Sequence, residues 1–317
     1  MIAVMLLCPC VFADEPANIY FDFETASGAL FSTAREFVLK SNNDVISRLD
    51  WPIIAPYISV MPKLSIYKFV VQTSVTSAIP PLSACGKMED FDFILPDSNS
   101  VSHYSIHDIY LDKYYTVSVQ AGRQIAIKRI NFDITPMAGF LFSSRKWSAM
   151  NGYVQYPPNN QAWTGGEEKR TVTGTVISYE QAVYAPFIAV EARLALSNFL
   201  FALSAHFSPY MWAYSLDTHF VTSVQYYDTM NGGLAGGVSL SARYYFGGGK
   251  PADGGGSLHL GLGLSCAYQG MRSAAGLTSD SFIGITESNF ETSKNYQSKL
   301  ESDEFKVSLV FVLTSMW

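Results

Sequence analysis

The feature of this chain that most constrains its fold is an alternation of apolar and polar residues, repeated in strand-length segments. The last segment is the clearest, because Phe305, Leu309 and Leu313 fall on one parity while Glu304 and Lys306 fall on the other. Successive side chains of an extended chain point to opposite faces, so each such segment predicts a β-strand with one apolar face. About ten segments show the pattern, an even number as single-chain antiparallel barrels require, at residues 28–40, 45–60, 63–79, 105–122, 125–146, 174–197, 199–216, 234–246, 257–270 and 304–316.

Composition favours a membrane location for these strands. Only 15% of the 317 residues are charged, whereas about 25% is typical of soluble domains, and 14% are aromatic. No uninterrupted apolar run of about 18 residues follows the N-terminus, which argues against a membrane-spanning helix. The expected fold class is therefore all-β, a ten-stranded antiparallel transmembrane β-barrel. The net charge of −6, without a basic cluster, argues against nucleic-acid partners.

The two ends of the chain suggest export to the outer membrane of a diderm bacterium. Residues 1–13 resemble a secretory signal peptide, with an apolar stretch and a small residue, Ala13, suited to cleavage, although the lack of a basic region suggests a true start upstream. Residues 14–317 would then form one barrel domain in contact with outer-membrane lipid. The last strand is aromatic to its final residue, and Trp317 is the expected contact for the barrel-assembly machinery. Cys85 and Cys266 remain after cleavage and define no disulfide framework.

Long polar intervals separate every second pair of predicted strands. They cover residues 80–104, 147–173, 217–233 and 271–303. Long extracellular loops alternating with short periplasmic turns are typical of outer-membrane barrels. We therefore expect these intervals to be loops at the extracellular mouth of the barrel.

One acidic pair lies in the first of these intervals. Asp90 and Asp92 are two residues apart, so their side chains share a face if the chain is extended. Two neighbouring carboxylates repel, which raises one pKa and lets them share a proton, so the pair could hold a water or stabilise a developing oxyanion. The alternatives are two solvated loop acids or a calcium site, although the Gly and terminal Glu of a calcium-binding loop are missing.

A second pair, Asp217 and His219, begins the third interval. A carboxylate can fix the tautomer of an imidazole and stabilise its charged form, which makes the histidine a better general base. The alternative is an unrelated loop Asp beside a loop His. The polar parity that runs from Ser204 through Tyr214 puts both residues on the opposite face, so they face inward only if the chain bends or bulges after Tyr214. No Gly-x-Ser-x-Gly, His-Glu-x-x-His or Cys-x-x-Cys motif is present, so neither a serine hydrolase nor a metal site is expected.

The chain resembles the omptin family of outer-membrane proteases over most of the mature sequence. The resemblance rests on short blocks in a shared order: Leu49-Asp50-Trp51, Met61-Pro62-Lys63-Leu64-Ser65-Ile66, Gly86-Lys87-Met88-Glu89-Asp90-Phe91-Asp92-Phe93, Met137-Ala138-Gly139 with Ser143, Ile177-Ser178-Tyr179-Glu180-Gln181 with Pro186-Phe187-Ile188, and Asp217-Thr218-His219. It implies a ten-stranded barrel with an extracellular active site and peptide or protein substrates. Asp217 would orient His219, His219 would activate a water, and Asp90 and Asp92 would stabilise the tetrahedral intermediate without an acyl-enzyme.

Two departures from the family pattern concern specificity and lipid. Two acids give the family its preference for a basic P1 side chain, and ungapped matching puts Arg35 and Ser215 there, with Glu36 one residue off on the other parity. A cationic Arg35 would repel Arg or Lys at P1. The family also needs lipopolysaccharide as an activator, held partly by charged residues of the fifth strand. Phe140, Phe142 and Ser144 stand near that stretch, which argues against this dependence.

The sequence thus predicts an omptin-like outer-membrane endopeptidase that uses no cofactor. Two rivals remain. One is a catalytically inactive barrel that acts as an adhesin or surface-binding protein. The other is a small pore, which is disfavoured because about ten strands leave little lumen once side chains fill it.

Overall fold

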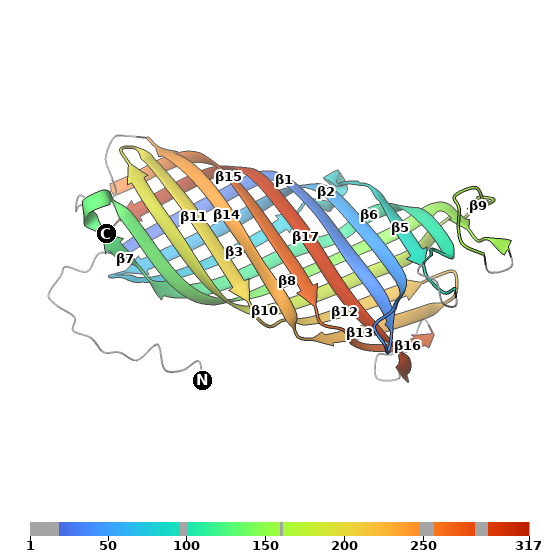
Figure 1. The fold of residues 1–317 in the computed structure, drawn as a ribbon. Coiled ribbons are helices and arrows are strands. Elements are labelled where there is room, and N and C mark those ends of the chain that lie inside the picture. The colour runs from blue at the N-terminus through green and yellow to red at the C-terminus, as the bar shows by residue number, and fades with distance from the viewer. Residues whose placement is uncertain (1–18, 96–99, 159–160, 247–256, 283–290, 317) are drawn as a thin grey trace.

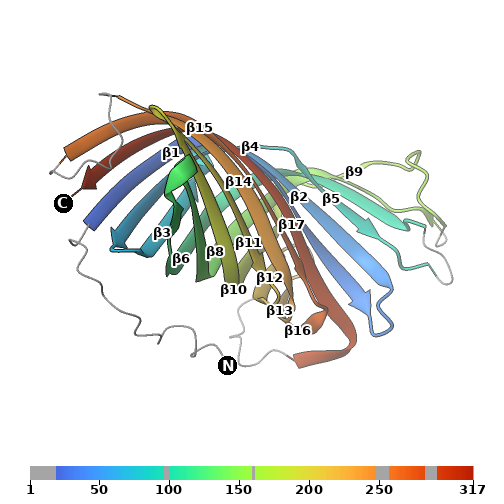
Figure 2. The same ribbon diagram turned by 60° about the vertical axis from the view of Figure 1, so that its left-hand side comes forward.

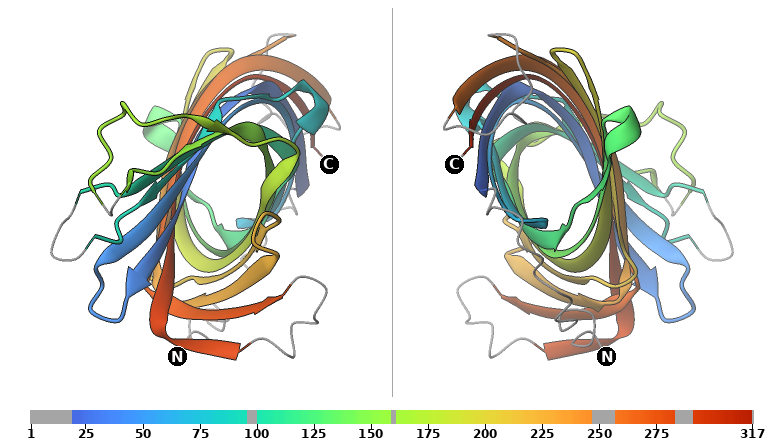
Figure 3. Two further views of the ribbon diagram at one scale, coloured as in Figure 1. Left: turned by 90° about the vertical axis from the view of Figure 1, so that its right-hand side faces the viewer. Right: turned by 90° about the vertical axis from the view of Figure 1, so that its left-hand side faces the viewer.

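The strands of this protein close into a barrel (Figures 1 and 3). The computed structural model describes residues 19–95, 100–158, 161–246, 257–282 and 291–316, so the expected signal segment and Trp317 lie outside the described part. β1 (Ile19–Lys40) pairs in antiparallel register with β2 (Val45–Ile66) on one side and with β17 (Glu291–Met316) on the other, which closes the sheet. Within the described ranges, no helix is long and apolar enough to cross a membrane.

The other elements follow one another around the ring. In chain order they are β3 (Phe69–Ala78), η1 (Pro80–Leu82), β4 (Ala84–Cys85), β5 (Lys87–Asp92), β6 (His103–Arg123), β7 (Ile125–Ile127), η2 (Lys128–Ile130), β8 (Phe132–Gln155), β9 (Arg170–Thr171), β10 (Thr175–Leu196), β11 (Phe199–Ser208), β12 (Trp212–His219), β13 (Val224–Asn231), β14 (Gly233–Tyr245), β15 (Ser257–Ser273) and β16 (Gly276–Phe282). β3 to β5, β6 with β7, β9 with β10, β11 with β12, β13 with β14 and β15 with β16 each continue one strand of the ring. The ring therefore has ten strands, and the predicted fold class is confirmed.

The strands extend further than the sequence pattern predicted. β5, β13 and β16 lie within intervals expected to be loops, and β8 continues to Gln155. Two connections at this end, 41–44 and 220–223, are short turns. The prediction was wrong here because polar residues such as Glu89, Gln225 and Thr229 stand at outward positions of these segments. The apolar parity that marks a lipid-facing strand is therefore lost, although the backbone pairing continues. Figure 2 shows this end, with β5 and β9, extending beyond the rest of the barrel.

Predicted boundaries were also wrong at the opposite end, where β1 begins at Ile19 rather than at residue 28 and β8 begins at Phe132 rather than at residue 125. The third segment was expected from residue 63, whereas β2 continues to Ile66 and a two-residue turn leads to Phe69 at the start of β3. The turn was not predicted because the residues on both sides of it are mostly apolar, so the apolar pattern continues through it without a break. The turn is made possible by Tyr67, which adopts a positive φ of 57°.

The outward parity carries the apolar side chains. Leu264 is 61% exposed, Phe311 54% and Ile58 50%, values expected of a face that contacts lipid rather than a core. Cys266 continues the parity of Leu264 and is a free cysteine, as the alternation predicted.

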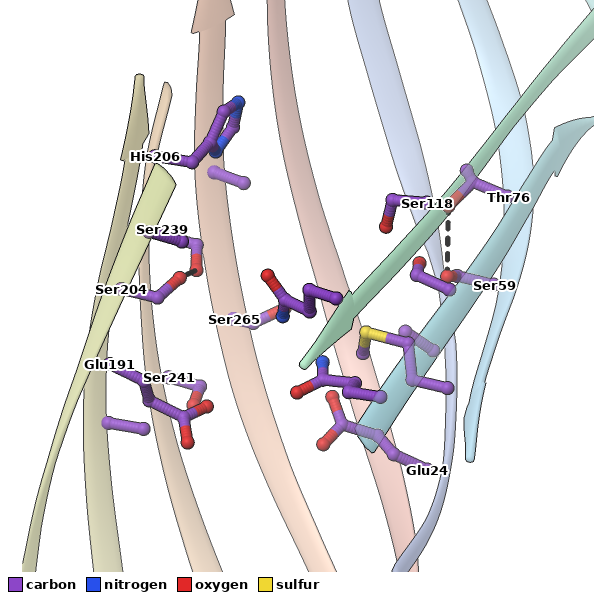
Figure 4. Close-up of a pocket in the computed structure, with 18 of the residues that line it drawn as sticks. Glu24, Ser59, Thr76, Ser118, Glu191, Ser204, His206, Ser239, Ser241 and Ser265 are labelled. Carbon is purple, nitrogen blue, oxygen red and sulfur yellow. Dashed lines mark hydrogen bonds between the residues drawn. The ribbon is translucent and has the colours of Figure 1, made fainter. Parts of the chain in front are cut away.

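Side chains fill the lumen at the level of this apolar band. Two ion pairs are nearly inaccessible to solvent: Lys63 with Glu191 at 2.8 Å and Arg145 with Glu304 at 2.9 Å. A cavity of about 260 Å³ between them is lined by hydroxyl and amide groups together with charged and apolar side chains (Figure 4). A cavity whose charged walls are paired with one another fits a packed interior better than an open pore.

An aromatic stack separates this cavity from the opposite end of the lumen. The ring of Tyr179 lies between those of Trp51 and Trp147, at centroid distances of 5.5 and 5.7 Å and within about 17° of parallel. All three side chains are fully buried. Stacked pairs of this kind contribute about 0.5–1.5 kcal/mol each beyond their area burial. The three rings fill the lumen at this level.

Candidate active site

A change of parity turns Asp217 and His219 into the barrel. Between Ile188 and Tyr184, β10 advances four residues, while the facing strand uses five to pass from Phe207 to Trp212. The extra residue is a β-bulge, and it reverses which parity faces inward. The even residues of β11 face the lumen, whereas Ser215 and Asp217 of β12 are buried and Tyr214 is exposed. The bend that the sequence required therefore occurs before Tyr214, at Pro209 to Met211, rather than after it.

Asp217 and His219 form a hydrogen-bonded pair. Nε2 of His219 lies 2.6 Å from Oδ2 of Asp217. Since the carboxylate can only accept, Nε2 carries the hydrogen, and Nδ1 of the neutral ring is left free to take a proton. Burial alone would lower the pKa of His219, but the charge and hydrogen bond of Asp217, with the charges of Asp90 and Asp92, raise it to about 9.

Asp90 and Asp92 act on His219 from another strand. Both belong to β5 rather than to a loop, and β5 is held between β2 and β6. Burial and the charge of Asp92 raise the pKa of Asp90 to about 7, against the opposing effects of His219 and of Ser47. Burial also raises the pKa of Asp92. Oγ of Ser47 donates to Oδ1 of Asp90 at 3.3 Å. The structure thus brings the two predicted pairs together, and the aspartates can share a proton at neutral pH.

A third group of acids lies beside the Asp217–His219 pair. Glu36 is 3% exposed and Asp228 1% exposed, and Ser215 donates to Asp228 at 2.8 Å. Burial, followed by the charges of Asp217, Asp228 and Asp90, raises the pKa of Glu36 well above its usual range. Burial raises the pKa of Asp228 to about 6. Oε2 of Glu36 and Oδ1 of Asp228 are buried without a hydrogen bond of good geometry in the described structure, although the hydroxyls of Thr278 and Ser298 lie close enough to oppose the rise in the pKa of Asp228. Buried carboxylates with free acceptor atoms form a site suited to a cation.

Arg35 is not part of this cleft, and its predicted place there was wrong. Its side chain lies on the outer face of β1, where it contacts Asp50 at 3.8 Å and Asp303 at 3.2 Å. Glu36, the next residue, takes the inward position. Ungapped matching shifted the parity by one residue, and a shift of one residue moves a side chain to the opposite face of a sheet. Ser215 lies inside the barrel, 3% exposed, and its expected contact with substrate stays a prediction.

The sequence analysis missed Glu36 and Asp228 for different reasons. For Glu36 a signal existed, because Phe21, Phe31 and Phe37 are all odd-numbered and mark the odd parity of β1 as outward. Asp228 lies in β13, inside an interval taken for a loop, so no parity was assigned to it. In the described part of the chain, no cluster of three or more His, Cys, Asp or Glu side chains is arranged to hold a metal ion.

Known proteins resemble this chain in sequence and in fold. Residues 17–250 match the model of the omptin family. The plasminogen activator of Yersinia pestis is 24% identical over 166 residues, which cover 51% of this chain and 51% of that protein, so the chain spans about half the length of this curated relative. The crystal structure of the outer membrane protease OmpT from Escherichia coli is similar with a TM-score of 0.78, at 15% identity, over 94% of this chain and 97% of that chain. The structural likeness supports the ten-stranded barrel.

Proposed function

This chain belongs to the omptin family of outer-membrane β-barrels, and on that premise we propose that it is an endopeptidase with a water-activating Asp–His pair. The observation that carries the proposal is the inward-facing pair of Asp217 and His219, 2.6 Å apart, whose electrostatic environment includes both carboxylates of β5. These groups lie at the end of the barrel beyond the apolar band. We infer that this end faces the exterior.

The proposed reaction needs only side chains of the cleft. Nδ1 of His219 takes a proton from a water held between the two pairs, and the hydroxide attacks the scissile carbonyl carbon. Asp217 stabilises the imidazolium that forms. The protonated member of the Asp90–Asp92 pair donates a hydrogen bond to the tetrahedral oxyanion. When the carbon–nitrogen bond breaks, His219 passes its proton to the leaving amine. Because water is the nucleophile, no acyl-enzyme forms.

The same cleft supports a preference for peptides with Arg or Lys at P1. Glu36, whose raised pKa favours the protonated acid in the free protein, would lose its proton when a cation binds. Glu36 and Asp228 would then accept the cationic side chain with carboxylate oxygens that lack a hydrogen-bond partner in the described structure. Arg35, which was expected to repel such a side chain, lies outside. The plasminogen activator and the protease among the similar proteins agree with a protein or peptide substrate.

Cleavage-site profiling of a peptide library is the experiment that tests the function. Wild-type protein folded in detergent should cut the library, and His219→Ala, folded to the same heat-modifiable barrel, should not. Failure of the wild type on varied peptides, with and without lipopolysaccharide, would instead support a surface-binding barrel.

Lipopolysaccharide is not expected to be required. On the outer face, Phe142 packs against Tyr184 at 4.8 Å between ring centroids, and Phe140 against Tyr184 at 6.4 Å. Aromatic rings in place of cations offer no charge-assisted hydrogen bonds to lipid phosphates. We therefore expect similar wild-type rates after removal and after re-addition of lipopolysaccharide.

The pH dependence of cleavage should be bell-shaped. The active form carries one proton on Asp90 while His219 is neutral. Between about pH 7 and pH 9 the two groups together hold one proton, and this form is the minor arrangement because the pKa of His219 lies above that of Asp90. Below about pH 7 both groups are protonated and the base is lost, whereas above about pH 9 the shared proton leaves and the oxyanion donor is lost. Initial rates at low substrate concentration should therefore give kcat/KM limbs near these values. Activity that rises continuously toward acid pH would contradict the assignment.

A further inference from the structure

A buried histidine that takes no part in the proposed reaction is connected to the aspartate pair. His107 of β6 is 1% exposed. Its Nε2 lies 3.0 Å from Oγ of Ser105, and that hydroxyl lies 3.5 Å from Oδ2 of Asp90. Adjacent strands hold the chain together, because Asp90 and Ser105 are register partners in the pairing of β5 with β6. The three side chains therefore form a continuous path from the aspartate pair into the barrel wall.

A bulge in the neighbouring strand fixes the orientation of His107. Asn151 and Gly152 of β8 have positive φ values of 56° and 100°, and the register between β6 and β8 shifts at this point. The carbonyl oxygen of Asn151 is thereby aimed at Nδ1 of His107, with which it forms a short hydrogen bond. A Cβ on residue 152 would come within 2.0 Å of the carbonyl oxygen of Ile106 and 3.0 Å of Nδ1 of His107. Only glycine permits this approach.

The acceptor at one end of the path determines the direction of the hydrogen bonds. A carbonyl oxygen can only accept, so Nδ1 of His107 carries the hydrogen and Nε2 of the neutral ring is an acceptor. The single hydroxyl hydrogen of Ser105 can point to Nε2 of His107 at 3.0 Å or to Oδ2 of Asp90 at 3.5 Å, and the shorter contact is the one with Nε2. With the hydrogen on that side, the oxygen of Ser105 accepts from a protonated Asp90, whereas an ionised Asp90 would compete with Nε2 for the same hydrogen.

We propose that His107 is a positioning residue that, through Ser105, keeps the catalytic proton on Asp90. The inference rests on the proposed peptidase function: the proton that Asp90 directs at Ser105 in the free protein is the one that turns to the oxyanion when the tetrahedral intermediate forms. Burial lowers the pKa of His107, although the hydrogen bond to Asn151 opposes this shift. The lowered pKa keeps the ring neutral, with Nε2 as an acceptor. The charged groups near it are Asp108 on its own strand and Lys87 on β5, which pair with each other at 2.8 Å; β8 contributes the backbone carbonyl.

The pH profile of cleavage separates this role from a merely structural one. Ser105→Ala and His107→Phe each interrupt the hydrogen bonds between His107, Ser105 and Asp90, so the protonated form of Asp90 should be less stable and its pKa lower. The acid limb of kcat/KM should then move to lower pH by about one unit, and the plateau should fall about tenfold, since fewer molecules hold the proton on Asp90. Ser105→Thr restores a hydroxyl and should restore both. Ser148→Ala, which removes a hydroxyl bonded to Asp112 at 2.6 Å on the outer face, should change neither. A lower rate with an unmoved acid limb would overturn the proposal.

A spectroscopic measurement tests the path without relying on activity or on a variant that folds. In wild-type protein labelled with ¹⁵N-histidine, the His107 resonances should show a neutral ring with the hydrogen on Nδ1 at neutral pH. A ring with the hydrogen on Nε2, or a charged ring, would overturn the proposed direction of the chain. If the wild type cleaves no peptide but shows this tautomer, the peptidase proposal fails while the hydrogen-bond path stands.

Discussion

His219→Ala should lower kcat by about 10²–10⁴, the usual scale of general-base catalysis, with a smaller change in KM. The substitution removes the nitrogen that takes the proton from water. Asp217→Asn should give a loss of similar size for a different reason. Its amide can present a donor to Nε2 of His219, which favours the tautomer with the hydrogen on Nδ1 and so blocks the base. The 2.6 Å contact between these side chains makes the rate sensitive to either change.

Folding and charge controls are available for this result. The variants should keep the heat-modifiable mobility of the closed barrel, because the pair lies in the cleft rather than in the strand pairings at the membrane. Asp44→Asn changes an exposed acid in the turn between β1 and β2, where Asp44 accepts a hydrogen bond from Asn42 at 2.7 Å, and should leave kcat unchanged. Proteolysis at the wild-type rate by a folded His219→Ala protein would exclude the assigned base.

The barrel could be predicted because lipid imposes one simple condition on sequence. Every outward position within the membrane must be apolar, and Leu260, Leu262 and Leu264 satisfy this condition in direct alternation. Beyond the membrane the condition lapses, since both faces of a strand can be polar. The alternation then carries no information about pairing, which is why β13, with Asp228, was taken for a loop.

The residue types of the site could be predicted, but not all of their orientations. Asp217 and His219 were found by their spacing, yet only the bulge between Phe207 and Trp212 turns them inward. A bulge changes the register by one residue and has no obligatory sequence, although Pro209 lies within this one. The interchange of Arg35 and Glu36 was the same kind of error, because a comparison without strand parity cannot resolve a shift of one residue.

The buried acids of the cleft are unfavourable without a substrate. The negative charges of Asp217 and Asp228 repel that of Glu36, and within the described residues each of the three carboxyl groups retains a buried oxygen without a hydrogen bond of good geometry. Removing carboxylates from water is costly unless a cation compensates them. Arg35 would provide one if it faced inward, but it pairs with Asp303 outside. We therefore expect a cationic side chain of the substrate to occupy this site.

Glu36→Gln and Asp228→Asn should each reduce kcat/KM for a peptide with Arg at P1 by about 10–100-fold, the range expected when a charge-assisted hydrogen bond becomes a neutral one. A matched peptide with norleucine at P1 should lose much less, so the ratio of the two rates measures the selectivity directly. The double variant should nearly abolish the preference while retaining cleavage, because Asp217 and His219 are unchanged.

Arg35→Gln is the matched control for this experiment. It alters a charge one residue from Glu36 but on the outer face, where Arg35 contacts Asp50 and Asp303, so the ratio for Arg over norleucine should stay at the wild-type value. Acid pH gives an independent readout, since protonation of Asp228 below about pH 6 should weaken the preference in the same direction as Asp228→Asn. If Arg35→Gln raises the ratio, or if the double variant keeps it, the acidic pocket is not what selects the P1 side chain.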